Sequence, residues 1–227
     1  MKKITLALAL LSILPIKMSL AVNVGNITEI ISSDEDSLAK EIENTVNTAR
    51  LVNLTIEKID SPLENGKVIP VTDPNEILST PANLILPGQA KDVFKIIYQG
   101  PKDDKERYYR LNWKDDPIGE SGVTKSAKSA SATTSATIST ILVVAPRIEK
   151  FNYQYANSQV SNIGNSSFRV VASGPCLPEK QKYSVDGICR ERYYLMPHLA
   201  VKLQFVDLNN KKSSVGIWHK GDFIVVK

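Results

Sequence analysis

The chain has 227 residues, a formal net charge of +4 and 23% charged residues. Lys2, Lys3 and Lys17 all lie in the first 21 residues, which contain no acid, so residues 22–227 carry a net charge of only +1. This near-neutral balance gives no reason to expect nucleic acid or an anionic membrane as a partner. The remaining 206 residues (227 minus 21) are enough for two domains of ordinary size.

The first 21 residues read "MKKITLALALLSILPIKMSLA". A basic start, a long apolar run and small residues at its end are typical of a secretory signal peptide, here cleaved after Ala21. The alternative is an uncleaved membrane anchor, but Pro15 and Lys17 interrupt the apolar run. No later stretch approaches the roughly 20 apolar residues that span a bilayer. We therefore expect an exported protein without membrane insertion.

Strand patterns follow one another from residue 37 to residue 115. By propensity alone, "SLAKEIENTVNTARL" could be a helix, but among so many strands we favour a strand that ends at Asn44, followed by a turn. "RLVNLTIEKI" (50–59) alternates between two sets of side chains, and "RYYRLNWKD" (107–115) alternates aromatic with polar residues. Pro87-Gly88 between two apolar runs predicts a turn.

A serine- and alanine-rich segment, 121–135, precedes the uncharged β-branched run "ATISTILVVAP" (136–146). The first segment is interpreted as a loop and the run after it as a strand, which Pro146 ends because proline cannot donate to a ladder. Short strand patterns resume at Phe151 and continue to the C-terminus. The sequence thus predicts an all-β protein of antiparallel β-sandwiches, with one domain at 22–147 and a second at 148–227.

The chemistry-bearing residues are few. Cys176 and Cys189 are the only cysteines, and two cysteines in an exported chain predict a disulfide. His198 and His219 have no metal-ligand spacing, and His219, in a "WHKGD" turn, is interpreted as a solvated loop side chain. No nucleophile elbow, zinc-protease motif or phosphate-binding loop occurs. We expect neither enzymatic activity nor a metal or other cofactor.

Several stretches, in their order along the chain, resemble the periplasmic chaperones of the chaperone–usher pathway, most closely the chaperones of the common pilus in its alternative branch. The resemblance covers the whole chain after residue 21. The stretches that carry it are "RLVNLTIEKIDSPL", "LSTPANLILPGQA", "GPKDDKERYYRLNW", "TILVVAPR", "YQYANSQVSNIGNSSFRV", "GPC" and "YYLMP".

This resemblance implies two immunoglobulin-like β-sandwich domains in an L shape and a periplasmic location. It also implies pilin subunits and an outer-membrane usher as partners. The last strand of the first domain would complete an unfinished pilin sandwich by donor-strand complementation. Alternation along that strand separates two faces. The face assigned to the pilin comprises Ile138, Thr140, Leu142 and Val144, whereas Ile141, Val143 and Ala145 are assigned to the protein's own core.

Typical members of the family hold the pilin's C-terminal carboxylate with an arginine on the first strand and a lysine on the donor strand. Here the first-strand position falls near Thr28, with no neighbouring cation in the sequence, and the donor-strand position is also uncharged. The candidate anchors are Arg50, Arg110, Lys114 and Arg147. For Arg147 we favour a structural ion pair with Asp115 that braces the domain junction.

Two other classes of protein remain open. A two-domain fimbrial structural subunit or adhesin would share the fold, and a hydrolase could be built on a β-sandwich. The sequence does not identify the pilin, and it leaves open whether free molecules cap each other's open edges.

Overall fold

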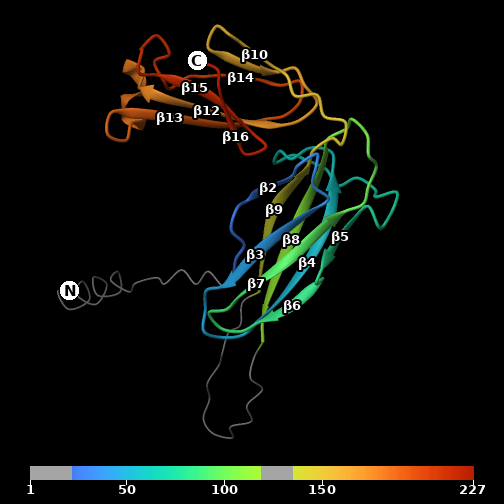
Figure 1. The fold of residues 1–227 in the computed structure, drawn as a ribbon. Helices are drawn as coiled ribbons and strands as arrows, with labels where there is room; N and C mark the ends of the chain where they lie inside the picture. The colour runs from blue at the N-terminus through green and yellow to red at the C-terminus, as the bar shows by residue number, and fades with distance from the viewer. Residues whose placement is uncertain (1–21, 119–134) are drawn as a thin grey trace, which may run out of the picture.

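The computed structural model describes residues 22–118 and 135–227, which are almost entirely β-strands and loops (Figure 1). The predicted signal peptide and the serine- and alanine-rich segment, apart from Ser135, lie outside the described residues. The elements are β1 (Val22–Asn23), β2 (Thr28–Ile31), β3 (Ser37–Asn44), β4 (Arg50–Ile59), β5 (Ile77–Thr80), β6 (Asn83–Leu86), β7 (Lys91–Tyr98), β8 (Arg107–Pro117), β9 (Ala136–Val144), β10 (Tyr153–Ala156), β11 (Gln159–Asn162), β12 (Phe168–Pro175), the 3₁₀ helix η2 (Pro178–Tyr183), β13 (Ile188–Leu195), β14 (Ala200–Lys202), β15 (Ser214–His219) and β16 (Asp222–Val225).

Strands β1 to β9 form the N-terminal unit, a sandwich of two sheets with strand orders β1-β3-β7-β5 and β2-β9-β8-β4-β6. Its core is built from the alternate inward side chains of both sheets, with Trp113 and Phe94 packed edge to face at its centre. The strand predicted to end at Asn44 is confirmed as β3, and the Pro87-Gly88 turn is confirmed between β6 and β7.

The first segment of the N-terminal unit belongs to both sheets. β1 pairs antiparallel with β3, whereas β2 pairs parallel with β9 in the other sheet. The chain changes sheets through Gly25, whose φ of 66° favours glycine because it has no Cβ to clash. As a consequence, β2 covers one edge of β9 along Ile141–Val144, and no strand of the described residues pairs with Ala136–Thr140 on that side.

Strands β10 to β16 form the C-terminal unit, a second sandwich with strand orders β10-β11-β14 and β13-β12-β15-β16. The predicted disulfide is confirmed: Cys176 follows β12 and Cys189 lies on the paired strand β13, with their Cα atoms 5.0 Å apart. Hairpin β15–β16 turns at Lys220 and Gly221, whose φ values of 49° and 81° match the two-residue turn that suits the twist of a hairpin.

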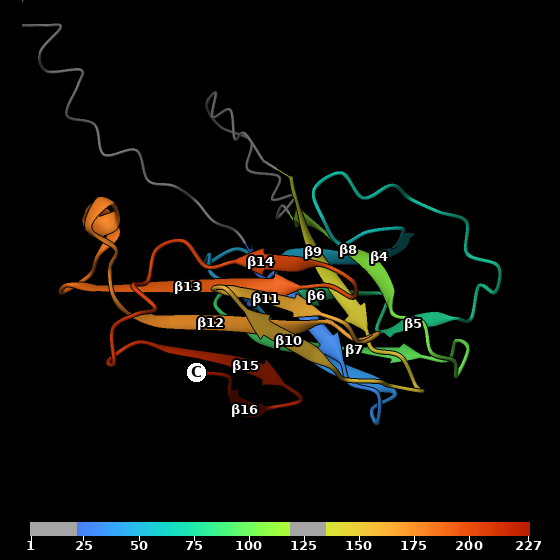
Figure 2. The same ribbon diagram turned by 90° about the horizontal axis from the view of Figure 1, so that it is seen from above.

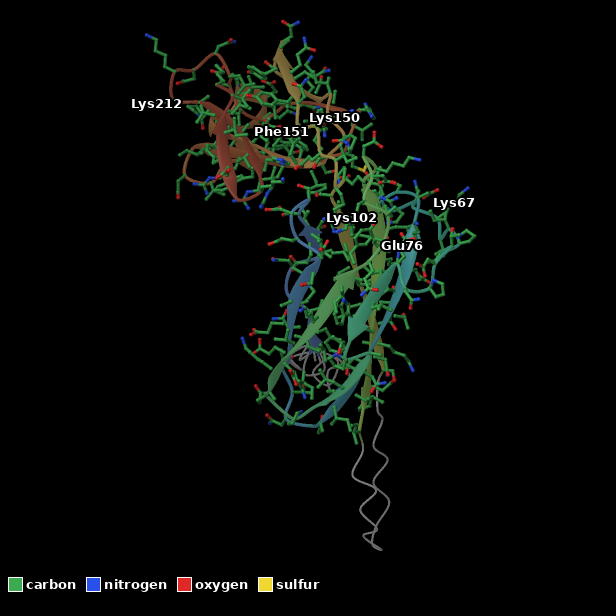
Figure 3. All side chains as sticks on the ribbon, turned by 45° about the vertical axis from the view of Figure 1, so that its right-hand side comes forward. Lys67, Glu76, Lys102, Lys150, Phe151 and Lys212 are labelled. Atoms are coloured by element: carbon green, nitrogen blue, oxygen red, sulfur yellow. A yellow bond between two sulfur atoms is a disulfide. The ribbon has the colours of Figure 1, made fainter. Side chains whose placement is uncertain are left out.

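The two units meet at an angle, like the arms of an L (Figure 1; seen from above in Figure 2). Each has its own core cluster, and no residue belongs to both. Residues 145–150 connect the units, and Lys150 and Phe151 lie close to their junction (Figure 3). The all-β class is therefore confirmed, whereas the domain boundary between residues 147 and 148 stays a prediction, compatible with the position of this connecting segment.

Candidate functional site

The open part of β9 is a ready template for another strand. Within the described parts of the chain, Ala136–Thr140 pairs with β8 on one side and with no strand on the other. Further along, the backbone N–H of Ile141 donates to the carbonyl oxygen of Ile27 at 2.7 Å, on the side opposite β8. Because backbone groups alternate in direction along a strand, Thr137 and Ser139 point their N–H and C=O groups to the same side as Ile141, where no described strand pairs with them.

The face of β9 assigned to the pilin points the other way, so this assignment was wrong. Leu142 and Val144 are 0% and 1% exposed within the core of the N-terminal unit, and Ile138 packs against the same cluster. Thr140 is also buried, and its hydroxyl accepts a hydrogen bond from the indole N–H of Trp113 at 3.0 Å. The free protein needs these side chains to fill its own sandwich.

The opposite face of β9 is more polar than expected. Thr137 and Ser139 are exposed and Ile141 is half-buried. Val143 and Ala145 are buried but belong to neither core cluster, which leaves Ile141 as the large apolar side chain of this face that remains partly accessible. A strand added here would gain mainly backbone hydrogen bonds from the described part of β9.

Of the candidate carboxylate anchors, Arg50 is buried inside the N-terminal unit. Its Nε and a terminal guanidinium nitrogen donate to the two carboxylate oxygens of Asp115 at 2.5 and 2.9 Å. The guanidinium and the carboxylate are 7% and 2% exposed. This bidentate pair replaces the expected pair between Asp115 and Arg147, because the register of β4 and β8 brings Arg50 and Asp115 onto one face of the sheet.

Arg147 lies at the end of the N-terminal unit, with a different set of partners. It donates to the carbonyl oxygen of Ser32 at 2.5 Å, lies 3.5 Å from a carboxylate oxygen of Asp36, and stacks over the Tyr98 ring at 5.0 Å. These partners all belong to the N-terminal unit. The proposed Arg147–Asp115 brace is therefore overturned.

The other two candidates lie on the outer face of the same sheet. Arg110 on β8 donates to the carbonyl oxygen of Gly66 and lies 3.7 Å from Glu57. Lys114, also on β8, is exposed and forms an ion pair with Asp116 at 3.0 Å. Neither lines the cleft between the units. The role of carboxylate anchor stays untested for all four candidates.

The first-strand position near Thr28 does have a cation beside it, contributed by β3. Buried Lys40 donates to the carbonyl oxygen of Asn26 at 2.7 Å and to Glu29 at 3.0 Å. Its charge is therefore balanced within the N-terminal unit, where it fixes the start of β2. The sequence did not reveal this neighbour, because it lies 12 residues from Thr28 and on a different sheet.

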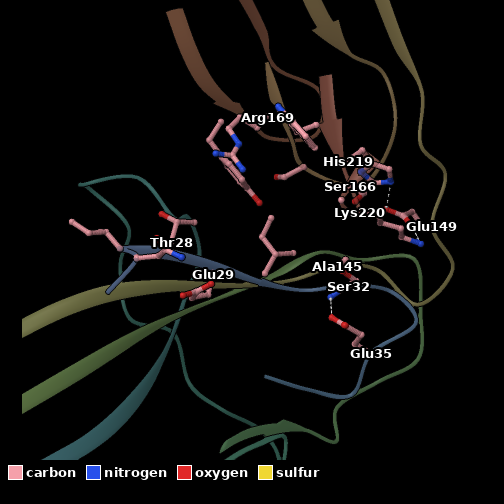
Figure 4. A pocket seen from close by; sticks show the side chains of 17 residues that line it. Thr28, Glu29, Ser32, Glu35, Ala145, Glu149, Ser166, Arg169, His219 and Lys220 are labelled. Atoms are coloured by element: carbon pink, nitrogen blue, oxygen red, sulfur yellow. Dashed lines mark hydrogen bonds and ion pairs between the residues drawn. The ribbon is translucent and has the colours of Figure 1, made fainter. Parts of the chain in front are cut away.

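A cleft of about 710 Å³ separates β2 from the C-terminal unit (Figure 4). One wall is the exposed edge segment Asn26–Ile30, and the other includes Arg169, Tyr194 and Trp218. Figure 4 shows Arg169 across the cleft from Thr28 and Glu29. The cleft is lined by β2, which pairs with residues 141–144 of β9, whereas the open segment 136–140 of β9 does not line it.

Glu149 holds one side of the junction between the units. Its carboxylate accepts hydrogen bonds from Ser33 of the N-terminal unit at 2.9 Å and lies 2.6 Å from Lys220 and 3.1 Å from His219 of the C-terminal unit. Burial by itself would raise the pKa of Glu149. The hydrogen bonds from His219, Lys220 and serine hydroxyls outweigh burial and hold this pKa below its usual range.

His219 was wrongly interpreted as a solvated side chain. It is only 12% exposed and stacks on the Phe151 ring, with the ring centroids 4.2 Å apart. It thereby packs the start of the C-terminal unit against the Glu149 carboxylate. The turn expected in "WHKGD" is confirmed, but nothing in the sequence indicates that Glu149, 70 residues earlier, lies beside it.

A second carboxylate, Glu106 of the N-terminal unit, also bonds to the C-terminal unit. It accepts the backbone N–H and the hydroxyl of Ser167 at 2.6 Å each, and the hydroxyl of Tyr108 at 2.7 Å. Burial raises the pKa of Glu106, and the bonds from Ser167 offset part of that increase. The Asn165 side chain adds a bond to the carbonyl oxygen of Asp104 at 2.9 Å. Glu149 and Glu106 thus both link the N-terminal unit to the C-terminal unit.

Other kinds of site are not found in the described residues. No group of three or more His, Cys, Asp or Glu side chains within 22–118 and 135–227 could hold a metal ion. In the same ranges, no helix is long and apolar enough to cross a membrane.

Known proteins with similar sequences cover the entire chain. A family model described as the EcpB C-terminal domain matches residues 151–226. The chain is 44% identical to "Probable fimbrial chaperone EcpB" of Klebsiella pneumoniae strain 342, and the match covers 100% of both chains. It is 43% identical to the protein of the same name from Escherichia coli O18:K1:H7, again over 100% of both.

Solved structures show the same fold at low sequence identity. The class 5 fimbriae chaperone CfaA aligns with a TM-score of 0.51 at 15% identity, covering 90% of this chain and 97% of that one. A chain of the complex between the Salmonella enterica SafA pilin and the SafB chaperone aligns with a TM-score of 0.50 at 14% identity, covering 88% and 91%.

These likenesses define the class first: a protein of two immunoglobulin-like β-sandwiches, with the architecture of the pilus chaperones. The sequence identity then fixes the particular group. The chain belongs to the EcpB family of fimbrial chaperones.

Proposed function

We propose that this protein is a periplasmic, non-enzymatic chaperone that captures pilin subunits and delivers them to an outer-membrane usher. The observation that carries the proposal is the open edge of β9, where the backbone groups of Thr137 and Ser139 have no described strand partner. Family membership supports the class of partner. Export would depend on residues 1–21.

The capture step that we propose is β-strand addition. An unfinished sheet of the pilin would pair with β9 along Ala136–Thr140, so that the sheet β2-β9-β8-β4-β6 continues into the partner. Each ladder bond contributes about 1 kcal/mol net. The inward side chains of β9 stay in the chaperone, because they form its own core. No cofactor or nucleotide enters this step.

A proline at the open edge tests the proposal directly. Thr137→Pro removes an outward N–H without removing a bond to β8, whereas Thr137→Ala keeps the N–H and removes only the side chain. Co-expression with a tagged pilin of the same bacterium, followed by size-exclusion chromatography, measures a one-to-one soluble complex. We expect Thr137→Pro to weaken capture by about tenfold, the equivalent of one lost ladder bond or somewhat more, and Thr137→Ala to resemble the wild type.

A proline on the opposite edge of the same sheet is the matched control. Ile85 lies on edge strand β6 and is 61% exposed, so Ile85→Pro makes the same chemical change far from β9. Equal capture by Thr137→Pro and the wild type, with both folded, would rule out strand addition at this edge. If the protein appeared as a component of the assembled fibre, it would instead be a fimbrial structural subunit.

A further inference from the structure

The C-terminal unit presents one sheet face with an unusual composition. Cross-strand registers align the outward side chains of four strands, and nearly all of them are exposed or half-buried. We call this surface the arginine face. It consists of Ile188, Arg190, Arg192 and Tyr194 on β13, Arg169, Val171 and Ser173 on β12, Ser214, Gly216 and Trp218 on β15, and Phe223 and Val225 on β16.

Three arginines on this face are not neutralised. In the described parts of the chain, Arg169, Arg190 and Arg192 are all exposed, and none makes an ion pair or a side-chain hydrogen bond. The face contains no acidic residue. The acid of β13, Glu191, points inward, where it accepts backbone N–H groups of residues 204–206. The guanidinium groups are thus available to a partner's carboxylates, which arginine can bind with two parallel hydrogen bonds.

On β15 and β16, the arginine face is aromatic and apolar. Trp218 and Phe223 are 40% and 45% exposed, and their ring centroids lie 5.2 Å apart. The Phe223 ring lies over Gly216, where a Cβ would come within 2.1 Å of it. The ring is therefore held flat against the sheet. Exposed aromatic rings beside unpaired arginines form the composition that is enriched at protein interfaces.

The position of the arginine face connects it to the open edge of β9. Arg169, Tyr194 and Trp218 line the cleft whose other wall is residues 26–30 of the N-terminal unit (Figure 4). Sheet β10-β11-β14 covers the other side of the C-terminal sandwich (Figure 1). The open segment 136–140 of β9 lies on the same side of the sheet as β2, which lines this cleft. A subunit that pairs with β9 and extends along this edge past β2 would therefore reach the arginine face.

The two units also carry net charges of opposite sign. Residues 148–227 contain 11 basic and 6 acidic residues, a net charge of +5, whereas residues 22–147 contain 14 basic and 18 acidic residues, a net charge of −4. The small total charge thus conceals a basic C-terminal unit. An acidic partner surface would be attracted to this unit and repelled from the other, which would orient it on approach.

We propose that the arginine face is a second docking surface, which binds an acidic surface of the pilin subunit held at the open edge of β9. This inference rests on the proposed function and adds the chemistry of the partner's second contact. Strand addition supplies sequence-independent backbone bonds, whereas the arginines select and orient subunits by charge. Complementary charge acts mainly on the rate of association and on its dependence on salt.

The test compares two double variants with the same change of charge. Arg190→Glu/Arg192→Glu reverses two charges on the arginine face. Lys211→Glu/Lys212→Glu makes the same change in the β14–β15 connection, and Lys212 lies on the C-terminal unit away from the strands of the N-terminal unit (Figure 3). A urea-denatured pilin of the same bacterium is diluted into each chaperone, and stopped-flow fluorescence measures the association rate constant at several NaCl concentrations.

We expect the arginine variant to associate about tenfold more slowly than the lysine variant at low salt, with a weaker dependence on NaCl. Identical rates and salt dependences for the two variants would overturn the docking surface while leaving strand addition intact. If Thr137→Pro also captures the subunit normally, the proposed function fails as well. Unchanged association combined with lost binding to phosphatidylglycerol vesicles would assign the face to lipid and equally overturn the proposal.

Discussion

Arg50 and Asp115 form a buried bidentate ion pair between β4 and β8, with nitrogen–oxygen distances of 2.5 and 2.9 Å. β4 and β8 are neighbouring interior strands of the sheet β2-β9-β8-β4-β6, and β8 also pairs with β9. The pair therefore stabilises β8, the strand that holds β9 and its proposed pilin-binding edge. It also accounts for two of the charged residues for which the sequence suggested other roles.

Removing one partner of this pair should destabilise the N-terminal unit strongly. Asp115→Ala leaves the Arg50 guanidinium buried beside an empty position, a loss of about 3–5 kcal/mol in the free energy of unfolding. Urea denaturation measures it. The double variant Arg50→Met/Asp115→Leu should recover most of the loss, because no charge is left uncompensated. Additive losses in the double variant would contradict the pairing.

Leu142→Asp should prevent folding of the N-terminal unit. The Leu142 side chain is 0% exposed in the core, and an unpaired carboxylate there costs at least about 4 kcal/mol, a large share of the stability of a typical domain. Thr137→Asp, on the exposed face of β9, is the control and should fold normally. Circular dichroism and thermal melting distinguish the two. A folded Leu142→Asp variant that fails only to capture pilin would restore the original assignment of the faces.

The Glu149 carboxylate should make the junction between the units sensitive to acid. Its pKa in the folded protein is below the ordinary value of 4.5, so its contribution to stability is present above that pH and is lost as the pH falls below it. Glu149→Gln should lower the melting temperature at pH 7 and flatten the dependence on pH between about 5 and 3. Glu179→Gln, an exposed residue, is the control and should follow the wild type.

Glu191 should be essential to the C-terminal unit in spite of its charge. The side chain is 3% exposed and accepts backbone N–H groups of Gln204, Phe205 and Val206 at 2.7 to 3.1 Å. Glu191→Ala leaves these donors without their acceptor, at about 1–3 kcal/mol for each that stays buried. Hydrogen exchange should show faster exchange at residues 204–206. Protection equal to that of the wild type would mean that water replaces the carboxylate without loss.

The sequence by itself determined the strands, the turns, the disulfide and the family. Alternation along β4, β8 and β9 reflects the period of two that every half-buried strand must show. Pro87-Gly88 and the glycine of "WHKGD" favour turns, because proline presets φ and glycine tolerates positive φ. Cys176 and Cys189 had no other candidate partner in the chain. The strands and turns depend on neighbouring residues, and the disulfide follows because there are only two cysteines. Both can therefore be predicted without the folded structure.

Only the tertiary structure decided which face of β9 points inward and which charges meet. A period of two separates Leu142 from Val143 but is symmetric between the two faces, so the choice depends on which sheet covers the strand. Arg50 meets Asp115 through the register of β4 and β8, and Glu149 meets His219 because the two units dock at one angle. Charge pairing acts over a few ångströms between residues far apart in sequence, and that proximity exists only in the folded chain.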